Sequence, residues 1–145
     1  MKNLCFALLA CCALSLFVGC GPKPIKTEGV TGTITINGVP TAGVNVTFIS
    51  FDGTGSDGYA MTDKDGKYQL QTLAGAANAG TTPGKYAVKF DYKEQIEDGT
   101  FEENGETKTR YKEKLAIDKK WTNEKTSGVM VDVVTGDNTF DFDIN

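Results

Sequence analysis

Histidine is absent from this chain of 145 residues, and the 15 basic residues are outnumbered by 19 acidic ones. Without histidine the chain lacks the commonest general base, the commonest zinc ligand and the usual partner of a serine or cysteine nucleophile. The formal net charge of −4 argues against the basic surface by which nucleic-acid-binding domains hold phosphates. Seventeen glycines and four prolines, without a repeat, exclude a collagen-like or proline-rich chain. The length fits one folded domain.

Cysteine is confined to the first 20 residues, at Cys5, Cys11, Cys12 and Cys20. The rest of the chain therefore cannot form an intramolecular disulfide or a thiolate metal cluster. Its fold must be stabilised without covalent cross-links, by the burial of apolar side chains.

Long hydrophobic runs are also missing, apart from one at the N-terminus. Leu4–Val18 is apolar except for Ser15. A helix needs about 20 apolar residues to cross the hydrocarbon core, so this run is short for a membrane span. Lys2 precedes it and Gly19 ends it, which is the pattern of a secretory signal peptide. A short N-terminal membrane anchor or a buried helix is the alternative interpretation, which the length disfavours.

The residues that end this run, Leu16-Phe17-Val18-Gly19-Cys20, resemble the lipobox at which bacterial lipoprotein signal peptides are cleaved. Phe17 departs from that pattern, where leucine is usual. The resemblance implies a signal peptide over 1–19 and a lipid-modified Cys20, followed by a tether over 20–27. Two or three acyl chains hold a protein on a membrane far more firmly than one. Gly21, where sorting to the inner membrane uses aspartate, favours the outer membrane.

After residue 28 the sequence alternates between apolar and polar residues. This period of two predicts half-buried antiparallel strands, with one face packed and one face in water. Asn37-Gly38 and Asp65-Gly66 are pairs that tolerate positive φ, and they predict tight turns between strands. Spacing of this kind suggests two sheets packed as a sandwich. Six strands are predicted within 30–36, 44–48, 68–71, 85–92, 129–133 and 139–144, and 58–62 is a candidate for a seventh.

Three blocks resemble the carboxypeptidase regulatory-like domain of the transthyretin-like (prealbumin-like) type. The first contains Val-x-Gly-x-Ile, Gly-x-Pro and Gly-Val-x-Val-x-Phe within residues 29–48. The second is Ala60–Leu70, and the third is Pro83–Val88. The resemblance implies a Greek-key β-sandwich of about seven antiparallel strands over 28–145. Members of the family are mostly non-catalytic modules near a membrane, on enzymes or at a cell surface.

Residues 93–126 break the alternation and carry charge sorted by sign. The segment from Glu94 to Glu106 holds six acidic residues and no basic one, whereas the segment from Lys108 to Lys125 holds seven basic residues and three acidic ones. We expect a solvated insertion in the domain, with a turn or two of helix at Arg110–Ile117. The functional alternative is a partner-binding loop carried on a rigid scaffold.

Three features are candidates for binding chemistry. The pattern Asp63-Lys64-Asp65-Gly66 is similar to part of a calcium-binding loop. Met61, however, occupies the position of the first carboxylate ligand, and this mismatch favours a hairpin turn. The acidic run 94–106 can hold a divalent cation loosely, although such runs are usually only solvated. Trp121 is either a stacking platform for a sugar or a residue packed on the edge of the sandwich, and the resemblance, which implies an aromatic residue packed at this place, favours the second.

Catalysis is not expected. Some transthyretin-like proteins hydrolyse hydroxyisourate with histidines and an arginine, but this chain has no histidine, and Arg110 is its one arginine. No nucleophile elbow or phosphate loop is present. We therefore predict no catalytic residue, no cofactor and no metal ligand, and Cys20 as the lipidation site.

The sequence thus predicts a membrane-anchored envelope lipoprotein with a structural or protein-interaction role at the cell surface. Its partner is an envelope protein or a glycan rather than nucleic acid. Two alternatives remain open, a carbohydrate- or small-ligand-binding module and an accessory subunit of an envelope enzyme.

Labelling with a palmitate analogue tests the lipidation of Cys20. We predict that the Cys20→Ala variant loses the label, because the thioether-linked lipid needs the thiol and the acylated amine needs cleavage at this residue. Fluorescence of the labelled protein on a gel is the measurement. Equal labelling of the variant and the original chain would contradict the prediction.

Overall fold

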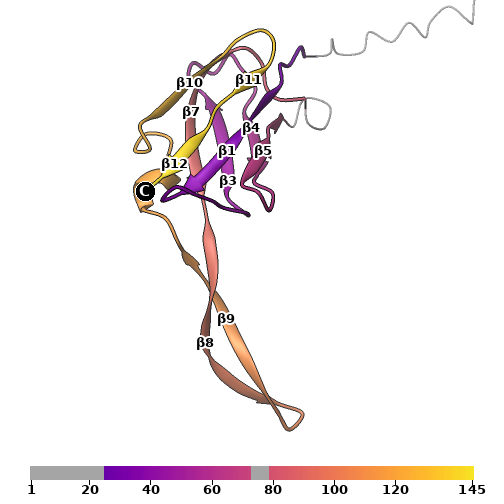
Figure 1. The fold of residues 1–145 in the computed structure, drawn as a ribbon, viewed down its shortest axis with the longest axis vertical. Helices are drawn as coiled ribbons and strands as arrows, with labels where there is room; N and C mark the ends of the chain where they lie inside the picture. The colour runs from indigo at the N-terminus through magenta and orange to yellow at the C-terminus, as the bar shows by residue number, and fades with distance from the viewer. Residues whose placement is uncertain (1–24, 73–78) are drawn as a thin grey trace, which may run out of the picture.

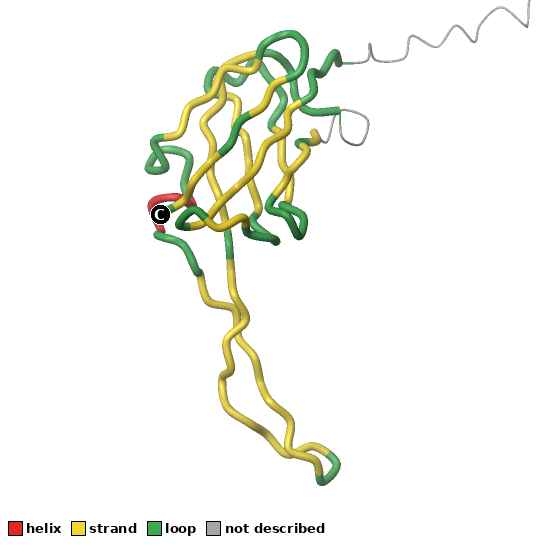
Figure 2. The backbone as a smooth tube through the Cα atoms, in the orientation of Figure 1, coloured by secondary structure: helices red, strands yellow, loops and turns green. Residues whose placement is uncertain are grey.

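The computed structural model describes residues 25–72 and 79–145, and nearly all regular structure in these ranges is β-strand (Figure 1). The exception within them is a short 3-10 helix, η1 (Lys119–Thr122). Two five-stranded sheets pack against each other, and two longer strands leave them as a separate ribbon (Figure 2). The predicted all-β sandwich is therefore confirmed.

The first sheet is built around β1 (Val30–Ile36). On one side β1 pairs in antiparallel fashion with β5 (Lys67–Gln69) and β2 (Val39–Pro40). On the other side it pairs with β11 (Asn138–Thr139) and β12 (Phe142–Ile144), and both of these run parallel to it. The expectation of purely antiparallel strands is thus wrong for the C-terminal pair, which returns to β1 from a distant part of the chain.

The second sheet is antiparallel throughout. Its order is β10-β7-β3-β4-β6, so β7 and β3 are central strands. These strands span Val129–Val133 (β10), Gly84–Asp91 (β7), Asn45–Ser50 (β3), Gly58–Met61 (β4) and Gln71–Thr72 (β6). Each of the seven segments overlaps a strand of the sandwich. Two segments expected as single strands are divided, 68–71 between β5 and β6 and 139–144 between β11 and β12, and the two-residue strand β2 is additional.

The core lies between the two sheets, where the alternation places every second side chain. Phe48 is at its centre, with ring centroids 6.1 Å from Phe140, 6.2 Å from Tyr86, 6.3 Å from Phe142 and 6.4 Å from Tyr68. Tilted aromatic contacts of this kind add to the free energy of area burial. The fully buried apolar side chains come from both sheets: Val30, Ile34, Val44, Val46, Phe48, Leu70, Tyr86, Val88, Phe90, Val133 and Ile144.

Two turns illustrate how local sequence acts. Asn37 and Gly38 both have positive φ, of 52° and 78°, and join β1 to β2 as their residue types predict. Asp65-Gly66 also forms a turn, but the flanking strands β4 and β5 belong to different sheets. The prediction that this pair closes a hairpin within a sheet is therefore wrong, because the turn carries the chain from one layer to the other.

Gly32 allows β1 and the C-terminal segment to approach closely. A Cβ atom at this position would lie 1.8 Å from the carbonyl oxygen of Phe140. The same carbonyl oxygen accepts a hydrogen bond of 2.9 Å from the Tyr68 hydroxyl, and Thr33 N–H donates to Asp141 Oδ1 at 2.7 Å. Burial, and the nearby negative charge of Asp141, raise the pKa of Tyr68 well above its usual range. The phenol therefore stays a donor at all ordinary pH values.

We predict that Gly32→Ala destabilises the sandwich by about 3 kcal/mol or more, because the new methyl group collides with main-chain atoms that cannot rotate away. Gly38→Ala is the matched control, since its Cβ meets open space and its cost is about 1 kcal/mol for the left-handed conformation. Urea unfolding followed by circular dichroism measures both. Equal losses for the two variants would show that the close approach at Gly32 is not a constraint.

Candidate functional site

The most distinctive feature of the molecule is a long β-ribbon that projects from the sandwich (Figure 1; Figure 2). Strand β8 (Lys93–Glu103) continues the central strand β7 with only Tyr92 between them. Strand β9 (Glu106–Leu115) returns antiparallel to it. At about 3.3 Å per residue, the ribbon reaches roughly 35 Å beyond the sandwich. Within the described residues, β8 and β9 pair only with each other.

The acidic and basic segments of the sequence form the two strands of the ribbon, so opposite charges lie across from each other. The acidic strand β8 lies beside the basic strand β9, and three ion pairs join them, two of which link an acidic residue of β8 to a lysine of β9. Lys112 Nζ lies 2.5 Å from Asp98 Oδ1, Lys93 Nζ lies 3.3 Å from Glu113 Oε2, and Lys108 contacts Glu103. Such exposed pairs are each worth only about 0.2–1 kcal/mol. They therefore add little to the stability of the ribbon.

Aromatic side chains are exposed along the same ribbon. Phe101 is 38% exposed, and the Arg110 guanidinium lies over its ring at 5.6 Å from the centroid. Tyr111 is 56% exposed, pairs across the strands with Glu97, and lies on the opposite face of the ribbon from Phe101. Aromatic residues and arginine are the side chains most often found at the centre of protein interfaces. The ribbon thus combines reach, unpaired edges and side chains suited to contact.

The prediction of a solvated insertion at 93–126 missed these strands, and the helix predicted at Arg110–Ile117 is wrong because Arg110–Leu115 belongs to β9. Both faces of the ribbon are polar, so no apolar alternation marks it. One signal was present, since Asn104 and Gly105 form the connecting turn with φ values of 56° and 80°. Asn-Gly between two extended segments is a strong hairpin signal.

The Asp63 loop is organised by its own main chain. The carboxylate of Asp63 accepts hydrogen bonds from the N–H groups of Lys67 at 3.0 Å and Asp65 at 2.9 Å. These two donors, in that order, hold the pKa of Asp63 below its ordinary value. Across residues 25–72 and 79–145, no group of three or more His, Cys, Asp or Glu side chains is placed to hold a metal ion. The carboxylate that the calcium interpretation needs serves the turn instead.

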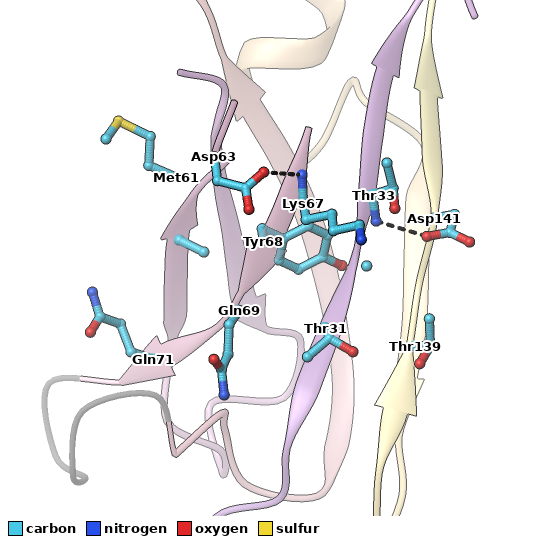
Figure 3. A pocket seen from close by; sticks show the side chains of 12 residues that line it. Thr31, Thr33, Met61, Asp63, Lys67, Tyr68, Gln69, Gln71, Thr139 and Asp141 are labelled. Atoms are coloured by element: carbon cyan, nitrogen blue, oxygen red, sulfur yellow. Dashed lines mark hydrogen bonds between the residues drawn. The ribbon is translucent and has the colours of Figure 1, made fainter. Parts of the chain in front are cut away.

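An open polar groove lies beside this loop, along the first sheet and the neighbouring strands β4 and β6 of the second (Figure 3). Thr31 and Thr33 of β1, Lys67 and Gln69 of β5, and Asp141 are among the residues that line it. Hydroxyl, amide and charged groups of this kind can meet a hydroxylated ligand. The groove lacks a free aromatic ring, however, because Tyr68 is only 4% exposed and its hydroxyl is already bonded to the main chain.

A smaller apolar patch lies on the outer face of the second sheet. Ile49, Ala87 and Met130 form one row across β3, β7 and β10, and Phe51 lies beside them. Phe51 and Met130 are 67% and 50% exposed. This patch is chemically suited to contact with another apolar surface.

Trp121 belongs to the sandwich, as the favoured interpretation predicted. Its ring meets Phe90 edge to face at 6.0 Å, and its indole Nε1 donates to the main-chain oxygen of Asn145 at 2.9 Å. The indole therefore fastens η1, at the base of the ribbon, to the C-terminus. A role as a free stacking platform does not agree with this packing.

The first described residues lie at the end of the sandwich opposite the ribbon (Figure 1). Glu28 fastens them there, because its N–H donates to Thr81 O at 2.8 Å and its carboxylate accepts from Gly136 N–H at 3.0 Å. At the other end of β1, Ile36 pairs with Ile144, next to the C-terminus that Trp121 contacts. The predicted lipidation site Cys20 and the signal peptide 1–19 lie outside the described residues.

Comparisons with known protein families, with curated proteins and with solved structures find no match to this chain. In the described part of the chain, no helix has the length and apolar character needed to span a membrane.

The lowered pKa of Asp63 gives a testable pH dependence. The carboxylate stabilises the fold above its unfolded-state pKa, near pH 4, and this contribution is lost as the pH falls through the lower folded-state pKa. We predict that Asp63→Asn lowers the melting temperature at pH 7, and that the difference from the original chain shrinks at pH 3.

Thermal unfolding at the two pH values measures this difference. Asp132→Asn, at an exposed position on the outer face of β10, is the matched control. A difference for Asp63→Asn that is as large at pH 3 as at pH 7 would contradict the role given to its carboxylate.

Proposed function

We propose that this protein is a non-catalytic envelope lipoprotein that presents the β8–β9 ribbon as a contact arm for another envelope component. A single observation carries the proposal. The chain enters the sandwich at one end, and the ribbon leaves from the opposite end. An anchor on Cys20 lies only five residues before Ile25, where the described structure begins. The arm would then point away from the membrane.

The lipid anchor is proposed from the lipobox-like residues ending at Cys20, with the outer membrane as the expected site. We also propose that the sandwich is a carboxypeptidase regulatory-like domain of transthyretin type, on the strength of the three sequence blocks. The arrangement of the described strands in two packed sheets supports this assignment without distinguishing a Greek key from other sandwiches.

The sandwich and the ribbon differ in how much of their surface they bury, and this difference supports a contact role for the ribbon. The sandwich has a dense aromatic core, so it is a rigid base. The ribbon has no core, and its side chains are almost all exposed. An extended element that buries so little within its own chain is more useful for contact than for stability. The lack of histidine supports a role without catalysis.

The two alternatives have less support. A glycan-binding module needs an exposed aromatic platform, whereas Trp121 packs on Phe90 and the ring of Tyr68 is buried under the polar groove. An accessory subunit of an envelope enzyme uses the same arm as the main proposal. It differs only in what the partner is, so the experiment below decides between a structural partner and an enzyme.

Recovery of partners with a shortened arm tests the proposal. In the shortened variant, Asn-Gly replaces 95–113, so that Glu94 and Lys114, which already pair, flank a two-residue turn. We expect the sandwich to keep its unfolding temperature, because the ribbon adds little to its core. We expect tagged full-length protein, cross-linked in cells and purified from solubilised membranes, to recover a partner that the shortened variant loses.

A second variant controls for the sandwich surface. Asp132→Asn changes an exposed residue far from the arm and should recover the same partner. Recovery of the same proteins by the shortened variant would show that the arm is not the contact element. Loss of the chain from the membrane fraction in Cys20→Ala, with the arm intact, tests the anchor separately.

A further inference from the structure

The edges of the ribbon are its most unusual property. A two-stranded ribbon in water is only marginally stable, and three or more strands are normally needed. Here both outer edges carry main-chain N–H and C=O groups that pair with no other strand among the described residues. Such edges are the standard template for addition of a further strand.

The charges on the two edges are opposite. Strand β8 carries five acidic residues and one lysine, whereas β9 carries four basic residues and two glutamates. Contact between two β8 edges brings acid against acid, and contact between two β9 edges brings base against base. Only the edge of β8 against the edge of β9 in another copy is complementary.

The direction of the strands agrees with this pairing. Copies anchored through their N-termini on one membrane point their ribbons the same way, so this step rests on the proposed function. Strand β8 runs away from the sandwich and β9 runs back. In neighbours with the same orientation, β8 of one copy is therefore antiparallel to β9 of the next. A two-fold axis along the membrane normal would instead place like strands together, in parallel.

We propose that the ribbons of neighbouring copies pair edge to edge, β8 of one against β9 of the next, to form a continuous antiparallel sheet distal to the membrane. The partner that the arm fits is thus a second copy of this chain. Because each copy uses two different edges, the contact is heterologous and generates a ring or a row rather than a two-fold dimer. Confinement on a membrane raises the effective concentration of the copies, which favours association through so small an interface.

A bulge in β8 limits the register in which β8 of one copy can pair with β9 of the next. The β8–β9 ladder is irregular between Glu97 and Thr100, and a bulge of this kind bends and twists the strand. Regular pairing along β8 is therefore divided into the segment before Glu97 and the segment after Thr100. Thr100 and Thr109 stand opposite each other beyond the bulge, and both are exposed and uncharged. They are suitable positions for probes.

Single cysteines at these positions test the proposal in the full-length chain. All natural cysteines lie at or before Cys20, so a thiol in the ribbon is well separated from them in sequence. Thr100→Cys and Thr109→Cys are each made with two different epitope tags, and like and unlike pairs of variants are produced together in separate cells. Membranes are then treated with a mild oxidant that joins adjacent thiols as a disulfide, because like positions of neighbouring copies would lie two strand spacings, about 10 Å, apart. We expect the doubly tagged product from the unlike pair to exceed that from either like pair by at least about tenfold, which corresponds to about 1.4 kcal/mol.

Two controls make the result specific. Asn45→Cys, an exposed position on the outer face of β3, should give no such product with either ribbon variant. Raising the salt concentration should lower the yield of the unlike pair, because exposed charges are screened. Equal yields from like and unlike pairs, or linking through Asn45→Cys with the same efficiency, would overturn the pairing.

Fractionation of the same cells separates this inference from the anchor on which it rests. A chain that stays in the membrane fraction but gives no unlike product overturns the pairing and leaves the anchor intact. A chain outside the membrane fraction that still gives the unlike product overturns the anchor and retains the pairing. The absence of any product overturns the pairing wherever the chain is found.

Discussion

The position of β7 is the constraint on which the rest of the structure depends. Its edges pair with β3 and β10, and Tyr86, Val88 and Phe90 are buried between the sheets. The strand then continues, after Tyr92, as β8. The ribbon therefore starts from a strand that is fixed on both edges and on its inner face. A projection that began from an edge strand or a loop would have no comparable base, so the direction of the arm follows from the core.

The two parts of the molecule are stabilised by different physics. The sandwich relies on apolar burial around Phe48, which is insensitive to salt and has little tolerance for added volume. The ribbon relies on main-chain pairing, the Asn104-Gly105 turn and exposed ion pairs such as Lys112–Asp98. These interactions are individually weak and are screened by ions. The ribbon is thus the part whose arrangement responds most to its surroundings.

The sandwich strands could be predicted because each has one apolar face. In β1 and β3 the buried positions fall at every second residue, which is the pattern that the core imposes, and in β7 the largest buried side chains, Tyr86, Val88 and Phe90, follow the same spacing. The ribbon strands could not be found in this way, because neither face is buried. Their charges gave an indirect signal, since an acidic run followed by a basic run suits two strands that pair. Recognising it required the turn at Asn104-Gly105 to be noticed as well.

The sequence by itself determined the strands of the sandwich and the tight turn at Asn37-Gly38, because apolar alternation and turn residues act over a few positions. Only the tertiary structure decided that β11 and β12 run parallel to β1, that Asp65-Gly66 joins the two sheets, and that the ribbon leaves the end opposite Glu28. The strand with which each strand pairs, its direction and the sheet that it joins depend on contacts between distant residues, such as Gly32 with Phe140. No local pattern encodes such contacts.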